Sequence, residues 1–136
     1  MDDERRISVT TNGSEGRSER SSPPDLKVRT REYALTVIRL YASLPKTTVE
    51  QVIGKQILRS GTSVGAHYRE AHRARSTAEF ISKLEGALQE LEETRYWLEL
   101  LESATQAEPS SLVILMGETD ELTAIFVASV KTAKVR

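Results

Sequence analysis

The chain has 136 residues, of which 38% are apolar and 29% charged, and its formal net charge is −1. This length suits a single domain with one modest core. Because there is no cysteine, disulfide bonds, cysteine-based zinc sites and thiol nucleophiles are excluded. The sequence shows neither a signal-peptide-like apolar region nor an apolar run of membrane-spanning length, so we expect a cytoplasmic protein that does not contact a membrane.

The small net charge hides a strong asymmetry along the chain. Residues 26–75 hold ten Lys and Arg against three Glu, a net of +7, whereas residues 76–136 hold five against eleven acidic residues, a net of −6. The two halves can pair within one chain or head to tail between copies, or they can form two solvated faces of opposite sign.

The predicted elements begin after a polar leader. Residues 1–25 lack apolar periodicity and contain Ser21-Ser22-Pro23-Pro24, so we expect them to be disordered. Residues 26–136 are expected to form the folded domain. Asp25 is the expected N-cap of a first helix, whose apolar residues recur every three or four positions until Pro45 ends it.

A second helix is expected to open at Thr48, where Gln51 completes a capping box. Its expected core face is Val49, Val52, Ile53, Ile57, Val64 and Tyr68.

Glycines form a stripe on this second helix. Gly61 and Gly65 lie four residues apart, and Gly54 lies a heptad before Gly61. Each interior glycine costs about 0.5–1 kcal/mol relative to alanine, so three on one side suggest the close approach of another backbone, either in the bundle or between subunits. Alternatively, Ser60-Gly61 ends one helix and Gly65 lies in a turn.

A third helix is expected to open with a capping box of Ser76 and Glu79. Its apolar stripe is Phe80, Ile81, Leu84, Ala87, Leu88, Leu91, Leu98 and Leu101. Near its end Tyr96, Trp97 and Leu100 widen the apolar surface beyond one face, which favours a second buried contact, such as a subunit interface.

A fourth helix is expected to follow a linker from Ser103 to Glu108, with Pro109 in its first turn. Short connections between four helices, and the absence of a strand pattern, predict an all-α antiparallel up-down four-helix bundle.

The sequence contains few of the residue patterns that are typical of enzyme active sites. His67 and His72 lie about 140° apart around a helix, which does not suit a shared metal, and there is no inward Glu-x-x-His pair. The Gly61–Gly65 segment has a serine in the middle, as in a nucleophile elbow, but a helix rather than a strand precedes it. We therefore expect no catalytic residue, no metal and no cofactor.

Basic residues of the second helix are candidates for nucleic-acid binding. They are Lys55, Arg59, Arg69, Arg73 and Arg75. Tyr68 and His67 lie among them as possible stacking groups, and a clustered positive surface is sufficient for binding a phosphate backbone. The alternative is that these arginines form salt bridges with glutamates of the third helix, within or between subunits.

Several motifs together resemble one known family. They are Gln56-x-Leu58-Arg59-Ser60-Gly61-Thr62-Ser63-Val64-Gly65-Ala66, Glu70-Ala71, Glu79-Phe80-Ile81-Ser82-Lys83-Leu84 and Leu91-Glu92-Glu93-Thr94-Arg95-Tyr96-Trp97-Leu98. Over roughly residues 26–130 the chain resembles the four-helix-bundle proteins encoded by 23S ribosomal RNA intervening sequences, which are similar to the accessory protein of diversity-generating retroelements. His67 stands where that family usually has Asn.

The resemblance implies a bundle that assembles into a ring, typically a pentamer, without catalytic activity. The retroelement relatives bind a reverse transcriptase and nucleic acid, so it also implies RNA, DNA or a nucleic-acid-processing protein as partners. We therefore expect a non-enzymatic oligomeric scaffold whose basic residues engage nucleic acid or a nucleic-acid-bound partner. The alternative is a protein–protein interaction module with no nucleic-acid role.

Overall fold

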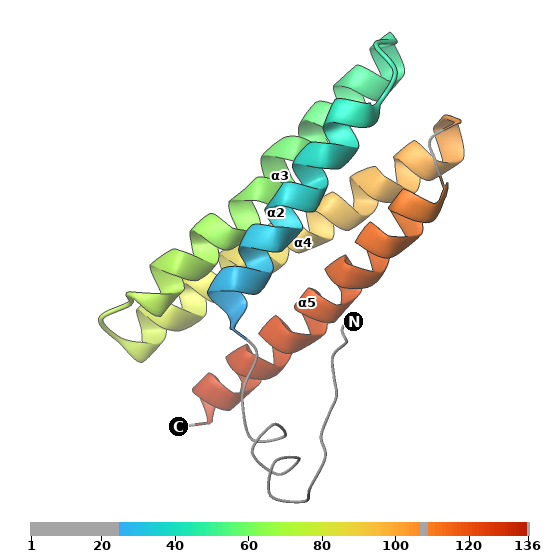
Figure 1. Ribbon diagram of the computed structural model, residues 1–136. Helices are drawn as coiled ribbons and strands as arrows, with labels where there is room; N and C mark the ends of the chain where they lie inside the picture. The colour runs from blue at the N-terminus through green and yellow to red at the C-terminus, as the bar shows by residue number, and fades with distance from the viewer. Residues whose placement is uncertain (1–24, 107–108, 136) are drawn as a thin grey trace, which may run out of the picture.

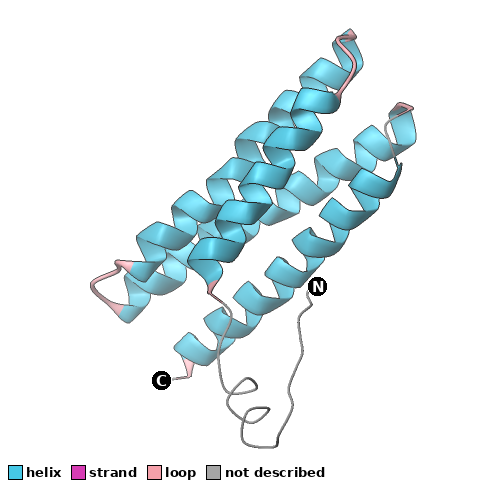
Figure 2. Ribbon diagram, in the orientation of Figure 1, coloured by secondary structure: helices cyan, strands magenta, loops and turns pink. Residues whose placement is uncertain are grey.

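The computed structural model describes residues 25–106 and 109–135. It contains four helices, α2 (Leu26–Ser43), α3 (Thr48–His72), α4 (Thr77–Ala104) and α5 (Pro109–Lys134). Successive helices run in opposite directions (Figure 1), and Figure 2 shows no strand in the described ranges. The predicted all-α up-down arrangement is confirmed. The predicted disordered leader lies outside the described residues, apart from Asp25.

Local signals in the sequence account for most helix ends. The Asp25 carboxylate accepts hydrogen bonds from the backbone N–H groups of Lys27 and Val28, at 3.1 and 3.3 Å, as an N-cap should. The Ser76 hydroxyl accepts one from the Glu79 N–H at 3.1 Å, so the N-cap half of this predicted capping box is confirmed. The Glu79 carboxylate accepts from the Arg75 N–H at 3.0 Å instead of the Ser76 N–H. The linker prediction was too long, because α4 continues to Ala104.

The predicted capping box of Thr48 and Gln51 is wrong by one residue. Thr47 is the N-cap of α3, and its hydroxyl bonds the carboxylate of Glu50 instead. The Gln51 side chain donates to the Pro45 carbonyl oxygen and accepts from the Tyr41 hydroxyl, both at 2.9 Å. Gln51 therefore ties the loop between α2 and α3 to the end of α2.

The core lies along the inward faces of all four helices. Its largest fully buried side chains are Tyr33, Phe126, Ile57, Leu84, Leu91, Leu98, Leu101, Leu112, Leu115, Leu122, Val37 and Val64. Two predicted core residues of α3 are wrong, because Val49 and Val52 are 50% and 56% exposed. Val49 lies in the first turn at the end of the bundle, and Val52 lies about 100° around the helix from the buried Ile53.

Helix α3 is continuous through its glycines, so the interpretation with a helix end and a turn is wrong. A β-carbon at Gly54 would lie 2.7 Å from the Leu44 Cδ1 atom, and one at Gly61 would lie 2.7 Å from the Val37 Cγ2 atom. At Gly65 the nearest atom would be the Thr30 hydroxyl oxygen at 3.2 Å. The stripe therefore faces α2 of the same chain, and the close approach takes place within the bundle.

The four helices do not pack evenly around the core. α3 packs extensively against α2 and α4, and α5 packs against α4, but α2 and α5 contact each other much less. Figure 1 shows α5 standing apart from α2. The bundle is therefore tight on three sides and more open on the fourth.

Candidate nucleic-acid interface

Three predicted basic residues lie on the outward side of α3, and a fourth, Arg73, is its C-cap. At about 100° per residue, Lys55, Arg59, Arg69 and Arg73 fall within about 80° of one another around the helix. All four are exposed, whereas the glycines face α2 and Ile57 and Val64 face the core. We call these four residues the basic stripe. Arg75 lies beyond the end of α3, in the loop to α4, and is not part of it.

Two of the five predicted cations have carboxylate partners in the chain. Arg59 Nη2 donates to Glu93 at 2.9 Å, and its Nη1 lies 3.9 Å from Glu90, so α3 and α4 are bridged here. Arg75 Nε lies 3.9 Å from Glu79, with a side chain that is 91% exposed, so this pair contributes little to stability.

The other three cations have no ion-pair partner among the described residues. Lys55, Arg69 and Arg73 are exposed, and no described carboxylate lies within 4.0 Å of their charged groups. Elsewhere Lys83 pairs with Glu70 at 3.2 Å, and Lys134 with Glu85 at 3.4 Å. Three of the four cations of the basic stripe thus have no carboxylate partner in the described part of the chain, and Arg59 is the exception.

The two predicted stacking groups are turned away from the basic stripe. The Tyr68 ring stacks on Phe126 of α5, with ring centroids 5.8 Å apart, and burial raises the pKa of its hydroxyl. His67 packs against Gly86 of α4, where an added β-carbon would lie 2.9 Å from its Nδ1 atom, and its Nε2 lies 3.6 Å from Glu90. Their positions in α3 serve packing between helices.

The predicted contact residues at the end of α4 differ in burial. Trp97 and Leu100 pack partly against the core, whereas Tyr96 is 54% exposed. The Tyr96 and Trp97 rings form an edge-to-face pair with centroids 5.1 Å apart. The Trp97 indole nitrogen is buried and has no hydrogen-bond partner among the described residues. The chain alone therefore covers much of this apolar surface but not Tyr96.

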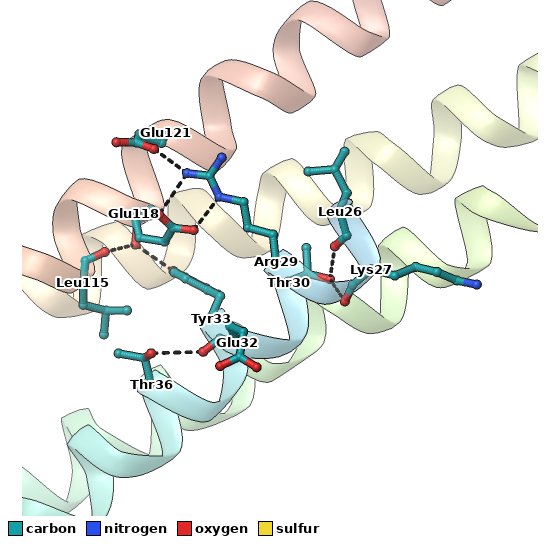
Figure 3. A network of polar contacts seen from close by, with 11 residues as sticks. Leu26, Lys27, Arg29, Thr30, Glu32, Tyr33, Thr36, Leu115, Glu118 and Glu121 are labelled. Carbon is teal, nitrogen blue, oxygen red and sulfur yellow. Dashed lines mark hydrogen bonds and ion pairs between the residues drawn. The ribbon is translucent and has the colours of Figure 1, made fainter. Parts of the chain in front are cut away.

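A groove of about 840 Å³ lies on the open side, between α2 and α5. Its lining includes the exposed Val113 and Ile114 of α5, and an added β-carbon at Gly117 would meet nothing within 4 Å. Arg29 of α2 crosses the groove to two carboxylates of α5, as Figure 3 shows. Its Nε donates to Glu118 Oε2 at 2.7 Å and its Nη2 to Oε1 at 3.0 Å, while Glu121 accepts a further bond from Nη2.

A buried pair of hydrogen-bonded side chains also joins α2 to α5 on the open side of the bundle. The Tyr33 hydroxyl donates to the Thr119 hydroxyl oxygen at 2.7 Å, while Thr119 donates to the Leu115 carbonyl oxygen at 2.7 Å. Burial raises the pKa of Tyr33 to about 12. The hydrogen bond to Glu118 contributes most to raising the pKa of Arg29 above its ordinary value.

Sequence reasoning did not find this α2–α5 contact. Arg29 and Glu118 are 89 residues apart, so no local spacing connects them. The opposite signs of the two halves of the chain were the available signal, but they did not identify the partners.

The described residues contain no group of three or more His, Asp or Glu side chains that could hold a metal ion. None of their helices has an apolar stretch long enough to cross a bilayer.

The comparisons with known proteins identify the family. Residues 24–128 match the family described as 23S rRNA-intervening sequence protein. The chain belongs to this family. The resemblance that the motifs indicate is therefore confirmed.

A solved structure agrees with this assignment. It is a crystal structure of a protein of unknown function from the S23 ribosomal protein family of Bacteroides thetaiotaomicron. That protein is 40% identical to this chain, with a TM-score of 0.73, and the match covers 78% of this chain and 98% of the other. No curated protein matches the chain significantly. Since the function of the solved relative is unknown, the comparison supports the fold but assigns no activity.

Proposed function

We propose that this protein is a non-enzymatic, self-associating helical scaffold of the cytoplasm that binds the phosphate backbone of a nucleic acid through the basic stripe. One observation carries the nucleic-acid part. Lys55 and Arg69 of the continuous helix α3, together with its C-cap Arg73, are exposed on one side and have no carboxylate partner among the described residues. Backbone binding needs clustered positive charge and releases counterions, so it does not require a pocket.

Exposed apolar side chains support the self-association part. Val113 and Ile114 of α5 are 59% and 68% exposed beside the α2–α5 groove, and Tyr96 is 54% exposed on α4. Apolar surface of this kind is often used for contacts between proteins. The family resemblance adds the ring, typically a pentamer, as the form of assembly. A nucleic-acid-processing protein that brings its own RNA or DNA is a further partner that this scaffold could hold.

Light scattering coupled to size-exclusion chromatography tests the assembly. A mass near five times 15.2 kDa would support the pentamer. A monomer at all concentrations would contradict it and would mean that the apolar surface of α4 and α5 needs no partner copy.

A titration with structured RNA and with DNA tests the binding. We expect retention that weakens with salt, and loss of retention in an Arg69→Ala/Arg73→Ala variant that still assembles. No retention of either nucleic acid at low salt would overturn the binding part.

The second candidate function is a protein–protein interaction module with no nucleic-acid role. The salt bridges from Arg59 to Glu90 and Glu93 favour it, because they show that an arginine of α3 can pair with α4 of the same chain. In this case charge reversal at Arg69 or Arg73 would disrupt assembly, whereas a ligand-facing arginine would tolerate it.

A further inference from the structure

The basic stripe consists of two clusters of cations held apart by the helix. Lys55 and Arg59 form one cluster, and Arg69 and Arg73 form the other. Their midpoints are separated by 14 positions of α3, or about 21 Å at roughly 1.5 Å per residue. Since the helix is continuous and packed against both α2 and α4, this separation is fixed before any ligand binds.

The side chains between the clusters are small, and the described hydroxyl groups there have no free hydrogen to donate. Thr62 and Ala66 lie on the same side of α3 as the cations. The Thr62 hydroxyl donates to the Leu58 carbonyl oxygen at 2.7 Å, and the nearby Ser63 hydroxyl donates to the Arg59 carbonyl oxygen at 2.7 Å. These hydroxyl hydrogens are used within the helix, so the middle of the stripe is poorly suited to reading base edges.

The stripe also lacks a stacking platform. Proteins that bind single strands usually combine positive charge with aromatic rings on which bases stack. Here Tyr68 stacks on Phe126 inside the bundle, and His67 faces α4. His72 is exposed but lies about 100° around the helix from Arg73. Tyr96, the exposed aromatic residue of α4, lies on another helix.

We propose that the basic stripe binds a double-stranded nucleic acid, with one cation cluster on each of two phosphate tracts that the duplex holds at a fixed separation. In a duplex the bases are stacked inside and are not available to aromatic side chains. A protein surface without aromatic rings can therefore bind a duplex through its backbones without losing stacking interactions. A B-form major groove is about 12 Å wide between its backbones, and long Lys and Arg side chains can lean inward from clusters about 21 Å apart. This inference rests on the proposed nucleic-acid binding and specifies its substrate class.

The two clusters should differ in strength. Arg59 is held by Glu93 at 2.9 Å, so its charge is partly compensated, whereas Arg69 and Arg73 have no such partner among the described residues. Glu93 is itself partly exposed, with 44% of its side chain accessible. Removal of the Glu93 charge should therefore free Arg59 for a phosphate and tighten duplex binding.

Fluorescence anisotropy tests the substrate class. The full-length protein is titrated against a labelled RNA duplex of about 16 base pairs, a DNA duplex of the same length and the single RNA strand. We expect at least tenfold tighter binding of the RNA or DNA duplex than of the single strand. The comparison of the two duplexes distinguishes RNA from DNA as the source of the backbone.

Variants locate the binding surface. Arg69→Gln/Arg73→Gln should weaken duplex binding and lower the slope of log affinity against log salt by about two, since each phosphate contact contributes about 0.9. The matched control is Arg39→Gln/Lys131→Gln, which removes two exposed cations from α2 and α5 and should change affinity less than twofold. Glu93→Gln should tighten binding several-fold. Light scattering and circular dichroism verify that each variant keeps its assembly and helix content.

The outcomes separate this inference from the proposed function. Equal or tighter binding of the single strand would overturn the duplex inference and leave nucleic-acid binding standing. Equal loss in the control variant would overturn the basic stripe as the site. Absence of binding to all three probes would overturn the proposed function itself, and the cations would then be assigned to an acidic protein surface.

Discussion

Val37 of α2 and Gly61 of α3 lie so close that a β-carbon at residue 61 would be 2.7 Å from one methyl carbon of Val37 and 3.0 Å from the other. Both residues are buried, and Val37 is a stiff β-branched side chain in a helix. Moving either residue away would cost packing energy in the core. This contact therefore sets the separation of α2 and α3.

Gly61→Ala should therefore destabilise the protein. Overpacking costs about 1–3 kcal/mol, and the gain in helix propensity of at most roughly 1 kcal/mol offsets only part of a cost in the middle of that range. Urea unfolding measures the change. Gly117→Ala is the matched control, because its β-carbon would meet nothing within 4 Å, and it should be neutral or stabilising by up to about 1 kcal/mol. A stable Gly61→Ala variant would show that α2 can shift at this point.

A second prediction concerns the buried hydroxyl pair between α3 and α4. Ser60 and Thr94 are fully buried, and their hydroxyl oxygens lie 2.7 Å apart. Thr94→Val keeps the shape but removes the partner of Ser60, so it should cost about 1–2 kcal/mol.

A double-mutant cycle isolates this interaction. Because the double variant Ser60→Ala/Thr94→Val leaves neither hydroxyl behind, its cost should be less than the sum of the two single costs. Strict additivity in thermal unfolding would mean that the two hydroxyls do not stabilise each other.

The fold follows from local features that the sequence displays directly. Helix ends at Asp25, Ser76 and Pro109 follow from short-range capping and proline chemistry, and the inward faces follow from periodicity. Periodicity is less reliable at helix ends, which explains the exposed Val49. Tertiary contacts also decide between Thr47 and Thr48 as the N-cap. Gln51 is engaged by Tyr41 and Pro45 in the folded loop, so it is not available to a cap at Thr48.

The candidate site was less predictable for a related reason. A helical wheel places Lys55, Arg69 and Arg73 on one side of a helix, but it does not show which cations acquire partners from other helices. The pairing of Arg59 with Glu93 and the inward stacking of Tyr68 on Phe126 depend on packing over long sequence separations. Such contacts require the three-dimensional structure.

A third prediction concerns alkaline pH. Burial raises the pKa of Tyr33 to about 12, from an ordinary value of 10.0. The neutral phenol is thus favoured by folding, so its contribution is fully present below pH 10 and is lost as the pH rises from about 10 to about 12. A shift of about two units corresponds to roughly 3 kcal/mol at most.

The measurement is the free energy of unfolding between pH 9 and about 12. The wild type should lose stability more steeply than Tyr33→Phe, which has no phenol to ionise at this position. Tyr96→Phe changes an exposed tyrosine and is the control, because it should follow the wild type. If Tyr33→Phe and the wild type have the same slope, then the Tyr33 phenol does not limit alkaline stability.

The last prediction concerns the link across the open side of the bundle. Arg29 makes two parallel hydrogen bonds to Glu118 and one to Glu121, and its side chain is only 28% exposed. Paired Arg–carboxylate bonds of this geometry are stronger than single ones. Few other contacts join α2 to α5, so Arg29→Gln should destabilise the protein by about 1 kcal/mol and increase hydrogen exchange in α5.

The neighbouring Arg31 provides the control for this substitution. Its side chain is 63% exposed and lies 3.5 Å from Glu32 on the same helix. Arg31→Gln should therefore change stability by less than about 0.5 kcal/mol. Added salt should reduce the small Arg31 effect more than the Arg29 effect, because exposed charges are screened more strongly. Equal effects of the two substitutions would show that the Arg29–Glu118 contact does not hold α5 against α2, and that packing with α4 alone positions the last helix.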